Sequence, residues 1–170
     1  GGPGFTGEGW TTATPERLGD PAAVKGGTML AHMPAWPDNL RVYGIKSNTF
    51  MNSIVEGLCY GSLLSLHPQT MEFIPDLATH WKISEDKMIF SFRINPKAHW
   101  SDGTPVTADD VMATYRLIAD DTLLDPMSKE AIVNTMLEPV ARSKYIVEIK
   151  CREKNWRNFI TFAGMTLLPA

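Results

Sequence analysis

The chain has 170 residues, 44% of them hydrophobic, with 16 basic and 19 acidic side chains and a net charge of −3. A chain of this length can bury roughly 70% of the surface that it exposes when unfolded, so it can form a real core. Neither sign of charge is clustered, which argues against a nucleic-acid-binding surface, and no apolar stretch approaches the length of a membrane-spanning helix.

Residues 1–27 are rich in glycine and proline and have no hydrophobic periodicity. We therefore expect an extended N-terminal arm that needs another surface to hold it. The arm also lacks the charged start and apolar segment of a signal peptide, so we expect any export signal to have been removed or to lie outside this sequence.

Residues 28–43 are expected to hold a first strand and a loop. The apolar run Thr28–His32 ends shortly before Pro34, which is typical of a buried strand that enters a loop. A helix is then predicted from Asn48 or Thr49 to Leu58, with an apolar stripe that we expect to face the core.

Two hairpins are predicted next. Leu63–Leu66 and Glu72–Pro75 form short extended runs on either side of a turn. Thr79–Ser84 and Met88–Ile94 alternate apolar and polar residues, and the polar turn Glu85–Lys87 would join them.

A capped helix follows the second hairpin. Thr107 has the character of an N-cap, and Asp109 and Asp110 lie where the helix dipole favours negative charge. The apolar spacing predicts that this helix continues to Ile118.

The last third of the chain is predicted to contain a helix over Ser128–Met136, strands at Val140–Ser143 and Tyr145–Cys151, and a final helix that begins near Asn155. Residues 165–170 are expected to be a return strand. Because this apolar run closes the sequence, we expect a truncation within a larger protein. The fold class is therefore α+β with mostly antiparallel strands, centred on a small domain over 44–164.

Nothing in the sequence assembles a catalytic or metal site. His99 and Asp102 lie close together, but no nucleophile accompanies them, and the histidines lack the paired spacing of metal ligands. Asp120, Asp121 and Asp125 resemble a calcium loop only in composition. We expect no catalytic residue, no metal and no cofactor, and a hydrolase is the least favoured alternative.

The two cysteines are too few for a disulfide framework. Cys59 and Cys151 also lack metal-type spacing, so two buried free thiols are the default, and a single bridge between them stays open.

Four segments in order resemble the family-5 extracytoplasmic solute-binding proteins, the oligopeptide and dipeptide receptors of ABC importers. These are Gly26-Gly27-Thr28, Val55-Glu56-Gly57-Leu58, the stretch from Phe73 to Trp81, and the block Trp100-Ser101-Asp102-Gly103-Thr104-Pro105-Val106-Thr107-Ala108-Asp109-Asp110-Val111. The similarity runs from about Gly26 to Pro169. Two further segments are similar to the branch of the family that resembles the periplasmic component of the microcin C transporter. They are Asp38-Asn39-Leu40 and Lys154-Asn155-Trp156-Arg157-Asn158-Phe159.

The resemblance implies a two-lobed receptor of the type II-like periplasmic binding protein class, which closes on a peptide-like ligand and delivers it to an ABC permease in the membrane. It implies a periplasmic or extracytoplasmic location and no enzymatic activity. The segments 28–43 and 165–170 would belong to lobe I, whose remaining strands are absent here, and their unpaired edges could promote self-association.

The best candidates for ligand contacts lie in the loop after the first strand. A strand-end loop beside a cleft can present backbone groups and an aromatic face, which favours Met33, Pro34, Ala35, Trp36 and Asn39. The alternative to a ligand contact by Trp36, given equal weight, is that its ring simply covers the core. A docking module that uses Asp120–Pro126 is the alternative function.

Overall fold

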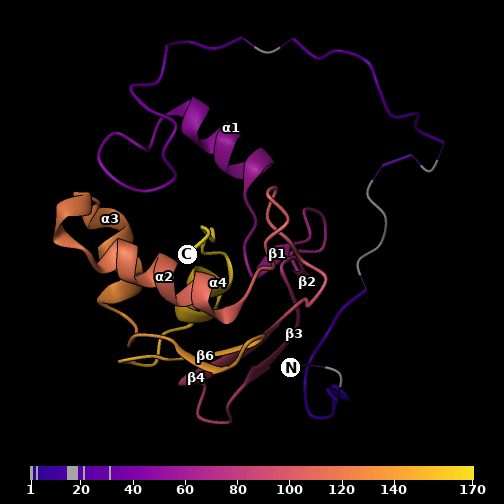
Figure 1. Ribbon diagram of the computed structural model, residues 1–170, viewed down its shortest axis with the longest axis vertical. Helices are drawn as coiled ribbons and strands as arrows, with labels where there is room; N and C mark the ends of the chain where they lie inside the picture. Colours follow the sequence, from indigo (N-terminus) through magenta and orange to yellow (C-terminus); the bar gives the residue numbers. More distant parts are fainter. Residues whose placement is uncertain (1, 3, 15–18, 21, 31) are drawn as a thin grey trace.

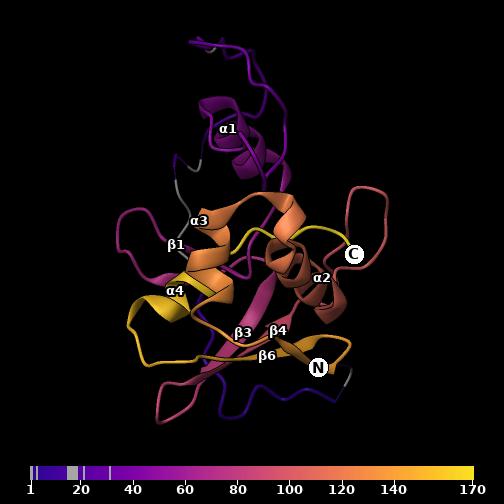
Figure 2. The ribbon, with the colours of Figure 1, turned by 90° about the vertical axis from the view of Figure 1, so that its left-hand side faces the viewer.

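The computed structural model describes residues 2, 4–14, 19–20, 22–30 and 32–170. Its centre is a four-stranded antiparallel sheet in the order β3-β4-β6-β5, which confirms the predicted α+β class. The strands are β3 (Ala78–Ile83), β4 (Ile89–Ile94), β6 (Ile146–Lys150) and β5 (Val140–Ser143). Helices cover one face of this sheet, and the N-terminal arm runs past the other (Figures 1 and 2).

Both predicted hairpins form, the larger one where alternation placed it and the smaller one where two short extended runs flank a turn. In the larger one, Ile83 pairs with Phe90 and Trp81 with Phe92, so each pair points to the helix-covered face. The smaller hairpin joins β1 (Leu64–Leu66) to β2 (Phe73–Pro75) as a separate two-stranded sheet. The period-2 pattern therefore reports the buried face correctly.

The predicted capped helix is α2 (Ala108–Ala119), and Thr107 is its N-cap. The final helix is α4 (Arg157–Ala163), which ends at Gly164 as expected. Rings from both sheets and α4 meet in one aromatic cluster, where Phe159 lies 4.8 to 5.6 Å from three other rings, those of Phe73, Phe90 and Phe92. Such contacts stabilise beyond simple area burial.

The helix predicted over Ser128–Met136 begins earlier and has a different character. Asp125 is the N-cap and Pro126 the first residue of α3 (Pro126–Ser128), which continues into a π-helical turn, η2 (Lys129–Val133). The prediction was wrong because it treated Asp125-Pro126 as a break, whereas proline is well suited to the first turn of a helix. A short 3₁₀ turn, η1 (Asp121–Leu123), precedes it.

The N-terminal arm lies on the sheet. Thr11 and Trp81 exchange two backbone hydrogen bonds of 2.8 and 2.9 Å at the open edge of β3, and the Thr12 hydroxyl donates to the carbonyl of Thr79. The ring of Phe5 packs against His80, with the Arg93 guanidinium 4.4 Å from its centroid. The arm thus covers an edge that would otherwise be free to pair with another chain.

Three expectations were wrong: a strand at Thr28–His32, a return strand at 165–170, and a core-facing stripe on the first helix. Thr28–Leu30 and His32 form no strand and are exposed, while Ala31 lies outside the described residues. Met165–Pro169 is not a strand either: Thr166 makes an isolated bridge to Ser62. A strand needs a hydrogen-bonding neighbour, and an apolar run alone does not supply one.

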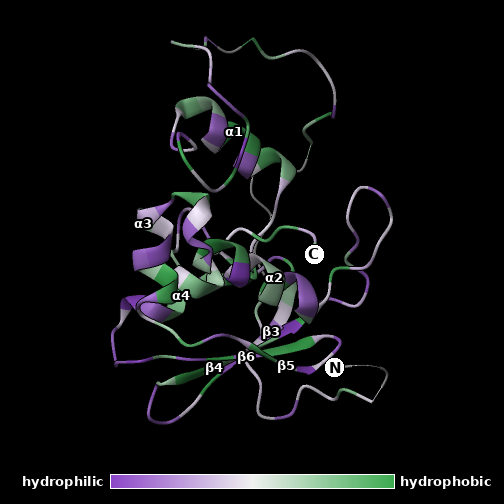
Figure 3. Ribbon diagram, turned by 60° about the vertical axis from the view of Figure 1, so that its left-hand side comes forward, coloured by the Kyte–Doolittle hydropathy of each residue, from purple (hydrophilic) through white to green (hydrophobic). Residues whose placement is uncertain are grey.

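The third error concerns α1 (Phe50–Cys59), which stands apart from the other helices at one end of the molecule (Figures 1 and 3). Its predicted N-cap, Thr49, is confirmed. Its apolar stripe faces outward, however: Leu58 is 81% exposed, and Cys59 is exposed rather than buried. No helix of the described chain is both long and apolar enough to span a bilayer.

Candidate ligand-binding cleft

The structure separates the five residues that the sequence suggested for ligand contacts. Pro34, Ala35 and Trp36 are exposed, and the Trp36 side chain is 87% exposed, so this ring does not cover the core. Met33 is partly buried. Asn39 lies in the wall of a cleft, and it alone of the five borders this cleft.

Asn39 organises the backbone around it. Its side chain donates to the carbonyl of Ile45 at 3.1 Å and accepts from the N–H of Arg41 at 3.0 Å. The buried side chain of Asn52 on α1 donates to the carbonyls of Asn39 and Arg41. These bonds tie segment 39–45 to α1 and fix its path.

The cleft has a volume of about 620 Å³ and is bordered by segment 39–43, the end of α1, α2, η1 and the C-terminal segment. Its wall is mainly apolar with two tyrosines and one guanidinium: the lining residues are Asn39, Leu40, Arg41, Val42, Tyr43, Tyr60, Leu117, Leu123 and Leu168. Sequence reasoning missed Leu40–Tyr43. A signal existed, since Val42 and Tyr43 are residue types enriched in strands, yet they fall in the part of segment 28–43 that was predicted only as a loop.

All four residues of segment 40–43 border the cleft. Within the described residues, the N–H groups of Val42 and Tyr43 have no hydrogen-bond partner. The segment is anchored at its end by Gly44, whose N–H donates to Asp125 at 3.0 Å. Gly44 has a φ of 112°, and an added Cβ would lie 3.2 Å from the carbonyl oxygen of Leu123, so only glycine fits here.

Tyr43 fixes the floor of the cleft. Its hydroxyl donates to the carbonyl of Thr166 at 2.8 Å, while the Thr166 hydroxyl donates to Glu56. Burial, reinforced by the nearby Glu56 carboxylate, raises the pKa of Tyr43 above its usual range. The hydroxyl therefore stays protonated and continues to donate.

The arrangement suits the binding of a solute. Backbone N–H groups without a partner among the described residues can pair with the carbonyl groups of a peptide, and the apolar wall can accept its side chains. The guanidinium of Arg41 adds a donor suited to a carboxylate.

The aspartates that the sequence placed near a catalytic turn or a calcium-like loop have structural partners. Asp102 accepts from the backbone and hydroxyl of Thr104, and Asp120 does the same for Thr122. Asp125 accepts from the backbone and hydroxyl of Ser128. No group of three potential metal ligands occurs among the described residues.

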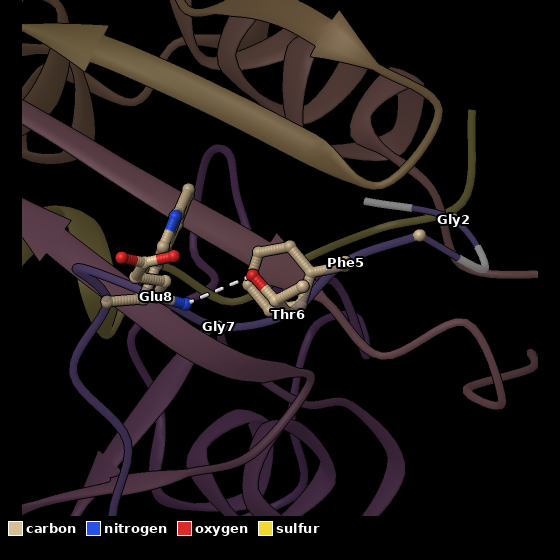
Figure 4. Close-up of a pocket in the computed structure, with 7 residues that line it drawn as sticks. Gly2, Phe5, Thr6, Gly7 and Glu8 are labelled. Carbon is tan, nitrogen blue, oxygen red and sulfur yellow. Dashed lines mark hydrogen bonds between the residues drawn. The ribbon is translucent and has the colours of Figure 1, made fainter.

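A second hollow, of about 370 Å³, is lined by the N-terminal arm itself (Figure 4). Its wall is largely glycine backbone and the Phe5 ring, and the N–H of Glu8 reaches the Thr6 hydroxyl at 3.5 Å. This hollow follows from how the arm is seated, and we assign no ligand to it.

Comparison with known proteins places this geometry in context. The family description "Bacterial extracellular solute-binding proteins, family 5 Middle" matches residues 72–170. The periplasmic murein peptide-binding protein MppA of Escherichia coli is 31% identical over 117 residues, which cover 63% of this chain and 20% of MppA. A putative binding protein of Brucella melitensis is 30% identical over 162 residues, which cover 88% of this chain and 25% of that protein.

Solved structures show the same fold at lower identity. Haemophilus influenzae OppA in complex with the peptide RPPGFSPFR superposes with a TM-score of 0.69 at 17% identity, over 78% of this chain and 29% of OppA. MppA in its unliganded open form superposes with a TM-score of 0.65 at 21% identity, over 75% of this chain and 27% of MppA. The match to MppA and to the Brucella protein spans a quarter or less of the length of each.

Proposed function

We propose that this chain, which belongs to the family-5 bacterial extracellular solute-binding proteins, contributes one wall of a receptor that captures peptide-like solutes for an ABC importer. The family match over residues 72–170 carries the proposal. Relatives named for binding murein peptide and oligopeptide support the choice of a peptide as the solute.

The cleft beside segment 40–43 is where we propose that this chain touches the ligand. The free N–H groups of Val42 and Tyr43 would pair with the peptide backbone, which is common to all peptides and gives affinity without sequence preference. Arg41 would meet a carboxylate of the ligand. The exposed ring of Trp36 remains a proposed contact from the adjoining loop.

The proposal includes the remaining features of such a receptor. The ligand would be released chemically unchanged, the protein would act outside the cytoplasm, and it would hand the solute to a membrane permease. The open cleft would close only against a second lobe, so the 170-residue chain by itself would bind peptides weakly.

A calorimetric titration tests the proposal. Tri- to pentapeptides would be titrated into the native protein expressed from its own gene, alongside versions N-methylated at one internal amide. If backbone pairing drives binding, the unmodified peptides should bind at one site, and methylation should weaken them about tenfold. Val24→Ala is the control, because this exposed side chain does not border the cleft and its loss should leave affinity unchanged. Equal affinity for methylated peptides would contradict the proposed contacts.

A further inference from the structure

A pocket at the end of the molecule opposite α1 takes no part in the proposed cleft. Its lining includes residues of β3, of β4 and of the turn between these strands. Figures 1 and 2 show this turn at the end of the molecule opposite α1. Its volume is about 390 Å³, and it is lined by Ile83, Lys87, Phe90, Lys154, Asn155, Trp156 and Phe159.

The floor of the pocket is apolar and consists of packed side chains. Ile83 and Phe90 are paired across the β3–β4 hairpin, and Phe90 packs edge-on against Phe159 at 5.2 Å. Phe90 and Phe159 are almost fully buried, whereas Ile83 is 42% exposed. The helix-covered face of the sheet therefore ends in an uncovered apolar surface.

The rim is aromatic and cationic. Trp156 is 78% exposed, and the guanidinium of Arg157 lies 5.1 Å from its ring. Four basic residues and one acidic residue lie between positions 150 and 157, in a chain of net charge −3. In the turn between β3 and β4, the carboxylate of Asp86 accepts hydrogen bonds from the Ser84 hydroxyl and the Met88 N–H. Lys87 of the same turn borders the pocket.

Lys87 also adopts a backbone conformation that favours glycine, with φ of 60°. A lysine in the left-handed region costs roughly 1 kcal/mol relative to glycine. Replacing Lys87 with glycine should therefore remove the charge without loss of stability.

We propose that this pocket docks an acidic loop of a protein partner that presents one large apolar side chain, such as phenylalanine or leucine, between carboxylates. The apolar side chain would enter between Ile83, Trp156 and Phe159, and the carboxylates would meet Lys87 and Lys154. Exposed aromatic rings beside basic residues are typical of the anchor sites of protein interfaces. The inference does not depend on peptide capture at the cleft.

The test uses the ¹⁵N-labelled chain and three capped peptides, with the sequences Glu-Phe-Glu, Lys-Phe-Lys and Glu-Ala-Glu. We expect Glu-Phe-Glu to shift the amide resonances of Ile83, Trp156 and Phe159, and to bind more weakly as salt is raised. The Lys-Phe-Lys and Glu-Ala-Glu peptides should bind at least about tenfold more weakly. Equal binding of Lys-Phe-Lys, or no shifts with any peptide, would overturn the proposal. Shifts confined to Val42 and Tyr43 would assign the peptide to the cleft and would also overturn it.

Three variants complete the test. Trp156→Ala should weaken Glu-Phe-Glu binding about tenfold, since an exposed ring can be removed without unfolding the chain. Lys87→Gly should weaken it about two- to fivefold while the melting temperature holds or rises. Lys97→Glu, in the loop beyond the other end of β4, should change nothing. Unaltered binding by Trp156→Ala and Lys87→Gly would refute the docking site.

Discussion

Removal of the Asp110 carboxylate should lower the free energy of unfolding far more than removal of an exposed carboxylate. Asp110 is 5% exposed, and one carboxylate oxygen accepts from the backbone N–H of Thr107 at 2.7 Å and from its hydroxyl. The other oxygen accepts from the Trp100 indole at 3.2 Å and from the N–H of Ala170 at 2.9 Å. One side chain therefore caps α2, holds the preceding turn and fixes the end of the C-terminal segment.

Asp110→Ala removes all of these bonds. Loss of the capping interaction costs about 1 kcal/mol, and the donors left without a partner add about 1–3 kcal/mol, reduced where they reach solvent. We expect a total loss of about 2–4 kcal/mol in the free energy of unfolding. Asp109→Ala, one residue away on the exposed surface, should lose only the dipole interaction, about 0.3–1 kcal/mol.

Urea denaturation followed by circular dichroism measures both variants. With a slope of about 2 kcal/mol per molar urea, Asp110→Ala should lower the midpoint by about 1–2 M without changing the slope. A midpoint for Asp110→Ala within about 0.3 M of that for Asp109→Ala would refute the role assigned to this carboxylate.

Three further predictions concern the N-terminal arm, the loss of stability at acidic pH and the reactivity of the two thiols. Phe5→Ala should loosen the arm by about 1–2 kcal/mol, because the ring loses its aromatic and cation–π contacts. The Trp81 amide, which bonds to the arm, should then exchange about tenfold faster, and an unchanged rate would contradict the seating of the arm. Burial alone would raise the pKa of Asp125, but its hydrogen bonds from Ser128 and Gly44 outweigh burial and hold the pKa below its ordinary value. The ionised carboxylate of Asp125 therefore stabilises the fold above its unfolded pKa of about 3.9, and this stabilisation is lost as pH falls through the lower pKa of the folded state. In Asp125→Asn, the urea midpoint should therefore decline less steeply below about pH 4. A decline equal to that of the unmodified protein would exclude this contribution. Cys59 is exposed and Cys151 buried, both as free thiols, and burial raises the pKa of Cys151. One thiol should react quickly with a disulfide reagent and the second only after denaturation, whereas no free thiol would indicate a bridge.

Local signals predicted the elements whose contacts are near in sequence. The β3–β4 hairpin follows from the alternation around Trp81 and Phe92, and α2 follows from the Thr107 cap. The block from Trp100 to Val111 carries the family resemblance and is also held locally, since the Trp100 indole bonds to Asp110 within it.

The errors arose where distant segments decide the outcome. Whether Thr28–His32 is a strand depends on a neighbour, and whether Leu58 is buried depends on what packs against α1, so neither follows from local pattern. The cleft and the pocket were missed for a related reason. Ile83 and Trp156 are far apart in sequence, and only the fold brings them together.

The measurement that tests peptide capture most directly is native mass spectrometry of the native protein incubated with a mixed peptide library. Capture without chemistry predicts a complex of one protein with one peptide, and every peptide released from it should keep its original mass. Peptides cleaved in proportion to incubation time, or no complex with any peptide in the library, would contradict the proposed function.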